Sequence, residues 1–230
     1  ASEAAIGKLP ENVIPHDGIS AGAAKQLVLD ELLLDNNPTQ NLATFVTTYM
    51  EPEAEELIAR GTRTNMIDAD EYPQTSTIHQ RCVNIIGSLW NAQPDAEGNY
   101  TGTSCVGSSE AIMLATLAMK FRWRKARKSA GLSTDKPNMV FGSNVQCCWH
   151  KACLYFDIEC READVSEDIL YLTADRAKPL IDENTIGVCP ILGSTFTGTF
   201  ENVKEIHDMV KSVNDKNGWN VPIHVDAASG

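Results

Sequence analysis

From Gly102 onward, short apolar segments alternate with longer amphipathic ones, and this alternation limits the possible folds more than any other feature of the chain. The short segments are typical of buried strands, and the stretches between them have helical spacing. Strands that alternate with helices pair as parallel βαβ units, so we predict an α/β fold with an open sheet covered on both faces. The predicted strands are residues 138–141, 157–162, 186–192 and 221–226, and the predicted helices are residues 108–129, 145–155, a short segment from 174, and 201–214.

The part of the chain before these segments is mainly helical in pattern and follows a loose arm. The predicted helices there cover residues 21–34, 53–60 and 76–90. The chain stops at Gly230, directly after a strand of buried type and before the loop and helix that should follow it. We therefore expect a piece of a longer protein, with an arm and a helix in residues 1–40 and the first part of a large domain in residues 41–230.

The composition excludes several functional classes. Of the 230 residues, 43% are hydrophobic and 22% are charged, which is typical of a soluble globular protein. The formal net charge of −12 argues against general nucleic-acid binding. Six of the nineteen cations lie between residues 120 and 128, which we interpret as a solvated helix end. No segment approaches the roughly 20 apolar residues that span a bilayer, so we expect no membrane partner.

Seven cysteines bear on the cellular compartment. Their odd number argues against a disulfide scaffold, and together with the lack of a secretory signal pattern it predicts a reducing, cytoplasmic location. Cys147, Cys148, His150 and Cys153 are close enough in sequence to suggest zinc. Because no second pair of ligands completes a tetrahedral site, we expect no metal.

Ligands of open parallel sheets bind outside the carboxyl ends of the strands, which directs attention to residues 142–150, 193–198 and 226–230. The start of a long helix is a further candidate for binding. Residues 103–109 form a loop of small side chains that leads into the helix at Ser108 and Ser109. Free N–H groups and the positive end of the helix dipole make such a start suitable for a phosphate. The alternative is an ordinary cap with Ser108 at the N-cap position. Nucleotide binding is a weaker possibility, because neither glycine fingerprint is present.

Asp226 is the second candidate, because it ends the last predicted strand. A carboxylate at the end of a buried strand is costly unless it is paired. Ala227 and Ala228 follow it and leave room for a flat group, so a cationic heteroaromatic nitrogen would suit the position. The alternative is an aspartate that caps the next helix.

Two further segments reach the same edge of the predicted sheet. Gln146 and His150 are four residues apart and share one helix face, whereas Lys151 is turned away from that face. His150 could act as an acid or base, or it could be an ordinary hydrogen-bonded histidine. Thr195 lies in a loop of hydroxyl residues after a strand, which could face a ligand or form a simple turn.

Taken in order, these pieces resemble the glutamate decarboxylases among the pyridoxal-phosphate-dependent group II decarboxylases. The resemblance rests on residues 30–45, 65–74, 78–90, 107–127, 145–162, 182–201 and 224–230. It implies the large domain of a PLP-dependent transferase of the aspartate aminotransferase-like fold (fold type I), incomplete and preceded by a helical segment.

The resemblance also implies roles for the cofactor-binding residues. Ser108 and Ser109 would hold the phosphate of pyridoxal 5'-phosphate, and Asp226 would pair with its protonated pyridine nitrogen. The other three are implied to surround the ring, with Gln146 over one face, Ala228 against the other and Thr195 nearby. The predicted catalytic residues of this chain are Asp226, through its pairing with the cofactor, and His150, as an acid/base group.

The implied reaction is decarboxylation of L-glutamate to 4-aminobutanoate and CO2. The residues that match the substrate's side-chain carboxylate pocket are Thr44, Phe45, Asn65 and Asp68. In the family they come from neighbouring subunits, which implies a homodimer with shared active sites, with a hexamer as an alternative assembly. A proton shared between Asp68 and the substrate would favour activity in acid.

One departure from the family pattern concerns the lysine that anchors the cofactor. It belongs to a Ser-x-x-His-Lys segment that would lie beyond Asp226, so we expect these 230 residues alone to be inactive. The calmodulin-binding tail of plant relatives cannot be assessed from these residues. The alternatives are a decarboxylase of aspartate or cysteine sulfinate, and an inactive fragment that only binds or assembles.

Overall fold

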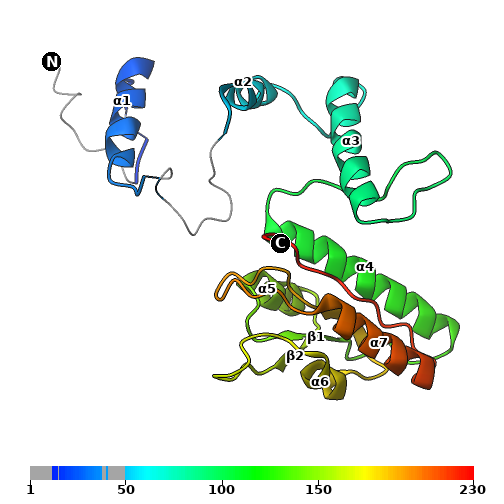
Figure 1. The fold of residues 1–230 in the computed structure, drawn as a ribbon. Coiled ribbons are helices and arrows are strands. Elements are labelled where there is room, and N and C mark those ends of the chain that lie inside the picture. The colour runs from blue at the N-terminus through cyan, green and yellow to red at the C-terminus, as the bar shows by residue number, and fades with distance from the viewer. Residues whose placement is uncertain (1–11, 15, 38–39, 41–49) are drawn as a thin grey trace. The chain divides into compact units, whose positions relative to one another are not determined.

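The computed structural model describes residues 12–14, 16–37, 40 and 50–230 (Figure 1). The chain divides into two compact units, residues 1–63 and 64–230. The first contains α1 (Ala21–Leu32) and α2 (Pro52–Gly61), neither of which has a buried residue. Within the described residues, no helix is both long and apolar enough to cross a membrane. The division predicted at residue 40 stays a prediction.

The second unit is an α/β structure with a three-stranded parallel sheet in the order β2-β1-β3. The strands are β1 (Asn138–Gly142), β2 (Glu159–Ala163) and β3 (Thr185–Cys189). The helices are α3 (Pro73–Leu89), α4 (Ser108–Ser129), α5 (Cys147–Tyr155), α6 (Ala174–Ala177), the 3₁₀ turn η3 (Lys178–Leu180) and α7 (Val203–Asn217). The predicted alternation of strands and helices is confirmed.

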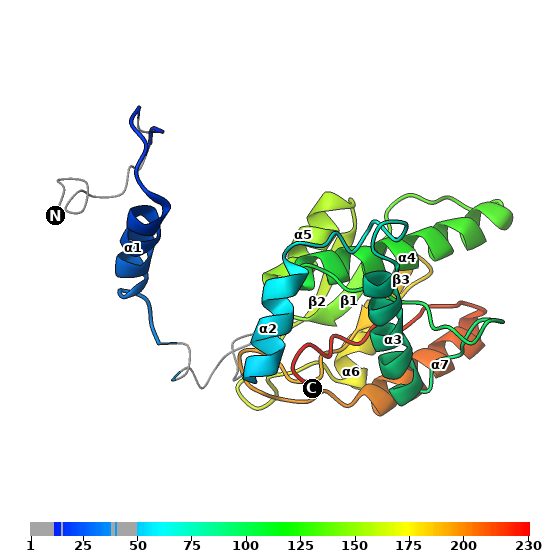
Figure 2. The same ribbon diagram turned by 90° about the horizontal axis from the view of Figure 1, so that it is seen from above.

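The sheet separates two apolar layers, because successive side chains of a strand point to opposite faces. Met139 and Phe141 of β1 belong to the cluster that includes α4 and α5. Val140 points the other way, into the cluster formed with α6 and α7. Figure 2 shows these two pairs of helices on either side of the strands. Both faces of the sheet are therefore covered, as the sequence predicts.

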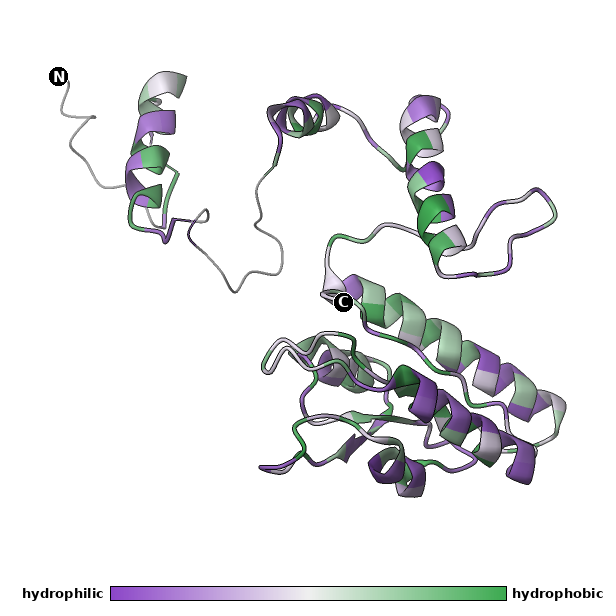
Figure 3. Cartoon of the chain, in the orientation of Figure 1, coloured by the Kyte–Doolittle hydropathy of each residue, from purple (hydrophilic) through white to green (hydrophobic). Residues whose placement is uncertain are grey.

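A glycine lies at each end of helix α4. Gly131, at φ +67°, follows its last turn, and the N–H groups of Gly131 and Leu132 donate to the carbonyls of Lys128 and Arg127. This double closure makes Gly131 the C′ residue of α4. The first half of the helix is mainly hydrophobic and the second half mainly hydrophilic (Figure 3), which fits the predicted solvated basic end. The predicted bounds of residues 108–129 are confirmed, and the alternative of Ser108 as N-cap does not hold, because Gly107 occupies that position.

The predicted strand 221–226 is present only as two isolated parallel bridges, Val188↔Ile223 and Ile191↔Asp226. Backbone hydrogen bonds join the N–H of His224 to the carbonyl of Val188, and the N–H of Asp226 to the carbonyl of Pro190. A regular ladder would also need an N–H at position 190, which proline lacks. The prediction of a regular strand over residues 221–226 therefore fails because of Pro190, in the segment that follows β3.

A polar network ties the amino ends of the strands together. The side chain of Asn138 donates to Asp182 Oδ1 at 2.8 Å and accepts from Thr185 Oγ1 at 2.7 Å. Arg161 of β2 pairs with Asp182 Oδ2 at 2.7 Å. Burial alone would raise the pKa of the Asp182 carboxyl, but the hydrogen bonds from Asn138, Arg161 and the Asn184 N–H outweigh it, so the pKa lies below its usual value.

We predict that Asp182→Asn lowers the free energy of unfolding at pH 7 by about 1–2 kcal/mol, because its amide nitrogen would face the Arg161 guanidinium donor to donor. A carboxyl with a lowered folded-state pKa contributes stability above its unfolded pKa, and this contribution is lost as the pH falls through the folded value. The deficit should therefore be full at neutral pH and shrink as the pH falls below about 4. Urea denaturation across this range measures it.

The matched control is Asp208→Asn, which alters a solvent-exposed pair with Lys204 on α7. It should change stability little, because surface ion pairs contribute little. Equal effects of the two substitutions, or a deficit of Asp182→Asn that persists in acid, would contradict the network's role.

Candidate active site at the carboxyl edge of the sheet

The carboxyl ends of β1 and β3 bring the predicted site residues to one edge of the second unit. β1 leads through residues 143–146 into α5, and β3 leads into the loop that holds Thr195. Asp226 pairs with Ile191 just beyond the end of β3. This is the edge at which open parallel sheets bind ligands.

Asp226 is half-buried, and its carboxylate is held by two donors. Trp149 Nε1 donates to Oδ2 at 3.2 Å, and the N–H of Ala228 donates to Oδ1 at 3.3 Å. Two carboxylate oxygens can accept about four hydrogen bonds, so Asp226 keeps acceptor capacity for a further group. The oriented carboxylate is therefore chemically suited to a cationic donor.

Trp149 is the central side chain beneath this site, and it was not among the predicted site residues. It is fully buried, its ring centroid lies 5.9 Å from that of Phe141, and it meets His224 edge-on at 5.3 Å. Burial lowers the pKa of the His224 imidazole, against the opposing charge of Asp226. The rings of Phe141 and the neutral His224 thus pack around Trp149 and orient its indole N–H toward the Asp226 carboxylate.

The amino end of α4 reaches the same region through Cys148. Burial raises the pKa of the Cys148 thiol, a hydrogen bond with the Ser108 side chain opposes this, and the charge of Asp226 raises it further. The start of α4 thus lies beside α5, the helix whose Trp149 donates to Asp226.

No side chain caps the start of α4. The first N–H groups of a helix, here those of Ser108 and Ser109, have no partner within the helix. The Glu110 carboxylate accepts instead from the N–H of Val106, at 2.8 Å. No atom lies within 4 Å of where a Cβ on Gly107 would stand, apart from its chain neighbours. These features fit an anion such as phosphate.

Gln146 and His150 lie differently in α5. Gln146 is the half-buried N-cap residue, and its side chain makes no capping hydrogen bond. His150 is exposed, with Nε2 3.1 Å from Glu162 Oε1 and its ring edge-on to Phe141. The interpretation as a hydrogen-bonded histidine accounts for this geometry.

Thr195 is exposed in a loop closed by two backbone hydrogen bonds. The N–H of Ser194 donates to the carbonyl of Thr199 at 2.9 Å, and the N–H of Gly198 donates to that of Ser194 at 2.7 Å. Gly193 has φ +84°, and a Cβ there would stand 3.0 Å from that of Ser229. The tight turn thus presents the Thr195 hydroxyl at the carboxyl edge.

Asn65 and Asp68 form the turn before α3. Asp68 Oδ1 accepts from the N–H of Glu71 at 3.1 Å, and Asn65 Oδ1 accepts from Ile67. Ser104 links this turn to the loop that precedes α4, because its hydroxyl contacts Met66 Sδ at 3.6 Å. Thr44 and Phe45 lie outside the described residues.

Glu201 is a buried acidic residue near this edge, and the sequence did not reveal its burial. It was predicted to begin a helix, but α7 begins at Val203 with Asn202 as its cap, and Glu201 is buried. Burial raises the pKa of the Glu201 carboxyl, against hydrogen bonds from Leu172, Ile191 and Asn144. An acidic residue just before a helix usually indicates a first turn in solvent, so no local signal distinguishes it.

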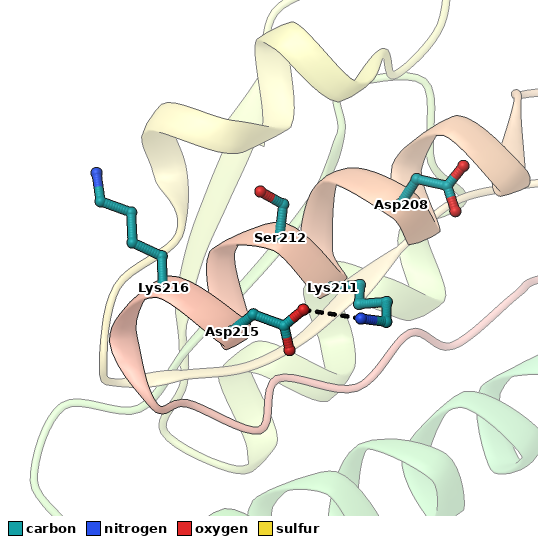
Figure 4. Close-up of a pocket in the computed structure, with 5 residues that line it drawn as sticks. All are labelled: Asp208, Lys211, Ser212, Asp215 and Lys216. Atoms are coloured by element: carbon teal, nitrogen blue, oxygen red, sulfur yellow. Dashed lines mark hydrogen bonds and ion pairs between the residues drawn. The ribbon is translucent and has the colours of Figure 1, made fainter.

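One further depression among the described residues lies away from this edge. Figure 4 shows a shallow depression on the outer face of α7, where Lys211 pairs with Asp215 at 2.7 Å beside Asp208, Ser212 and Lys216. This is a charged, solvated helix face. Among the described residues, no group of three or more histidine, cysteine or acidic side chains could hold a metal ion. The zinc hypothesis for residues 147–153 thus finds no ligand set in this part of the chain.

Residues 10–230 match the model of the pyridoxal-dependent decarboxylase conserved domain, and the chain belongs to that family. It is 50% identical over 222 residues to glutamate decarboxylase 2 of Arabidopsis thaliana, covering 96% of this chain and 45% of the relative. It is 46% identical over 224 residues to glutamate decarboxylase alpha of Listeria monocytogenes, covering 96% and 48%.

A solved glutamate decarboxylase of Lactobacillus brevis is 44% identical, with a TM-score of 0.92 over all of this chain and 52% of that one. These matches confirm the predicted fold class, that of the fold type I enzymes. A sphingosine-1-phosphate lyase of Burkholderia pseudomallei, 17% identical with a TM-score of 0.72, shares the fold over 98% of this chain and 51% of its own. The chain spans about half the length of the curated relatives it matches.

Proposed function

We propose that the protein containing this chain decarboxylates L-glutamate to 4-aminobutanoate with pyridoxal 5'-phosphate as its cofactor. The observation that carries the proposal is the Asp226 carboxylate, oriented by Trp149 and Ala228 and with acceptor capacity to spare. The choice of glutamate is supported by the names of relatives that are 46–50% identical to this chain.

The donor set at the carboxyl edge fits the cofactor. Ser108 and Ser109, at the start of α4 that no side chain caps, would bind its phosphate. Gln146 and Ala228 would lie against the two faces of the ring, and Thr195 would lie near it. When bound, the cofactor supplies an electron sink for the electron pair that remains when CO2 leaves.

Asp226 would hold a proton on the pyridine nitrogen, because a nearby carboxylate favours the charged form of a base. The indole of Trp149 would keep the carboxylate in line for that contact. We propose His150, four residues after Gln146, as the acid/base group, and Glu162 would orient its ring.

The substrate pocket would be completed by Thr44, Phe45, Asn65 and Asp68. The family resemblance supports their assignment to the side-chain carboxylate of glutamate and to a homodimer that shares its active sites. A carboxyl at position 68 that shares a proton with the substrate would make catalysis strongest in acid.

The direct test uses the full-length protein reconstituted with pyridoxal phosphate. Release of CO2 is measured with glutamate, aspartate and cysteine sulfinate at equal concentrations, between pH 4 and pH 7. The proposal expects turnover of glutamate far above that of the other two. Cofactor binding without glutamate turnover would refute the substrate assignment, and preference for aspartate or cysteine sulfinate would replace it.

We predict that Asp226→Asn lowers kcat for glutamate by at least about a hundredfold, because an amide does not stabilise a protonated pyridine nitrogen as a carboxylate does. The indole of Trp149 can still donate to the amide oxygen, so the fold should be retained, as circular dichroism would check. Asp215→Asn, on the exposed face of α7, serves as control and should leave kcat unchanged. Near-normal turnover by Asp226→Asn would refute its assignment.

We predict that Asp68→Asn lowers kcat/KM for glutamate about tenfold and flattens its dependence on pH, because the shared proton is lost. Asparagine keeps the oxygen that accepts from Glu71, so the turn and the affinity for pyridoxal phosphate should be unaffected. Asp70→Asn is the neighbouring exposed control. An equal loss of substrate turnover and cofactor affinity would assign Asp68 a different role.

A further inference from the structure

Glu201 is a buried charge whose partners come from separate parts of the chain. Its side chain is 2% exposed, and three donors satisfy its two oxygens. Oε1 accepts from Asn144 Nδ2 at 3.0 Å and from the N–H of Leu172 at 2.8 Å, and Oε2 accepts from the N–H of Ile191 at 2.7 Å. A buried carboxylate is tolerated only with such partners, so these segments must keep their positions for Glu201 to be stable.

The donors are close in sequence to the proposed cofactor residues. Asn144 lies two residues before Gln146, between β1 and α5. Ile191 lies four residues before Thr195, and the backbone N–H of Glu201 donates back to its carbonyl at 3.1 Å. Glu201 therefore closes the base of the Thr195 loop and fixes the segment that precedes Gln146.

The same contact extends to Asp226. Residues 190–192 form an extended segment. Glu201 hydrogen-bonds to Ile191, and Asp226 hydrogen-bonds to the residues on either side of it. The N–H of Asp226 donates to the carbonyl of Pro190 at 3.0 Å, and the N–H of Leu192 donates to the carbonyl of Asp226 at 2.8 Å. A shift of Glu201 would thus be transmitted to Asp226 through one short piece of backbone.

We propose that Glu201 is a positioning residue for the cofactor ring pocket, which holds Gln146, Thr195 and Asp226 in one fixed arrangement through its buried carboxylate. This inference rests on the proposed function for what the pocket binds. Glu201 does not touch the substrate or cofactor in this assignment, because all three of its side-chain donors belong to the protein.

Glutamine is a demanding test of this role, because it has the same shape but only one accepting oxygen. In Glu201→Gln, the amide nitrogen must face either the N–H of Ile191 or the donors of Asn144 and Leu172, and each choice places donor against donor. The double variant Asn144→Asp with Glu201→Gln restores one contact with reversed polarity, because the new carboxylate can accept from the glutamine amide.

The experiment uses the full-length protein reconstituted with pyridoxal phosphate. It records the visible circular dichroism of the bound cofactor, its dissociation constant, kcat and KM for glutamate, and the far-ultraviolet spectrum as a check of folding. Glu167→Gln, an exposed residue, is the matched control and should behave as wild type.

We expect Glu201→Gln to alter the visible circular dichroism and to lower kcat by about tenfold to a hundredfold, with KM changed much less, because small misplacements of reacting groups are costly. The double variant should recover part of both losses. If Glu201→Gln does not fold, Asn144→Ala, which leaves the two backbone donors, should show the same changes to a smaller degree.

A folded Glu201→Gln protein with wild-type cofactor spectrum and kcat, and only a lower unfolding temperature, would overturn the proposal. So would a double variant no better than the single one, or wild-type behaviour of Asn144→Ala where Glu201→Gln fails to fold. If the wild type binds pyridoxal phosphate but does not decarboxylate glutamate, the proposed function fails, and the cofactor spectra still decide the role of Glu201.

Discussion

The extended segment of residues 190–192 is held on one side by Glu201 and on the other by Asp226, and the carboxyl edge of the sheet depends on this arrangement. Pro190 has no N–H, so the segment cannot complete a regular ladder with the chain beside it. The backbone of Asp226 pairs with the carbonyl of Pro190 and the N–H of Leu192, and Glu201 pairs with both backbone groups of Ile191. The constraint is the cost of leaving buried polar groups without partners.

The two ends of the same sheet are organised differently. At the amino ends, Asn138, Asp182 and Thr185 pair with one another, and Arg161 is added from β2. At the carboxyl ends, Asp226 keeps acceptor capacity and the start of α4 has no side-chain cap. The hydrogen-bonded network stabilises the amino ends of the strands. The carboxyl ends can therefore present polar groups that are available to a ligand.

Local pattern was sufficient to predict most elements of the second unit, because strand and helix periods and the glycine at position 131 act within a few residues. Predictions from local pattern failed where a residue far away in the sequence determines the structure. Residues 221–226 have the pattern of a strand, yet the missing N–H of Pro190 interrupts the pairing. Glu201 resembles a solvated first-turn acid but is buried.

The sequence by itself determined the parallel α/β arrangement, the small-residue start of α4, and the place of Asp226 after the last strand-like segment. Only the tertiary structure decided that Trp149 donates to Asp226, 77 residues away, and that Asn144 donates to Glu201, 57 residues away. The reason is physical: periodicity follows from the geometry of neighbouring residues, whereas the pairing of a buried polar group depends on which distant segments the fold brings to it.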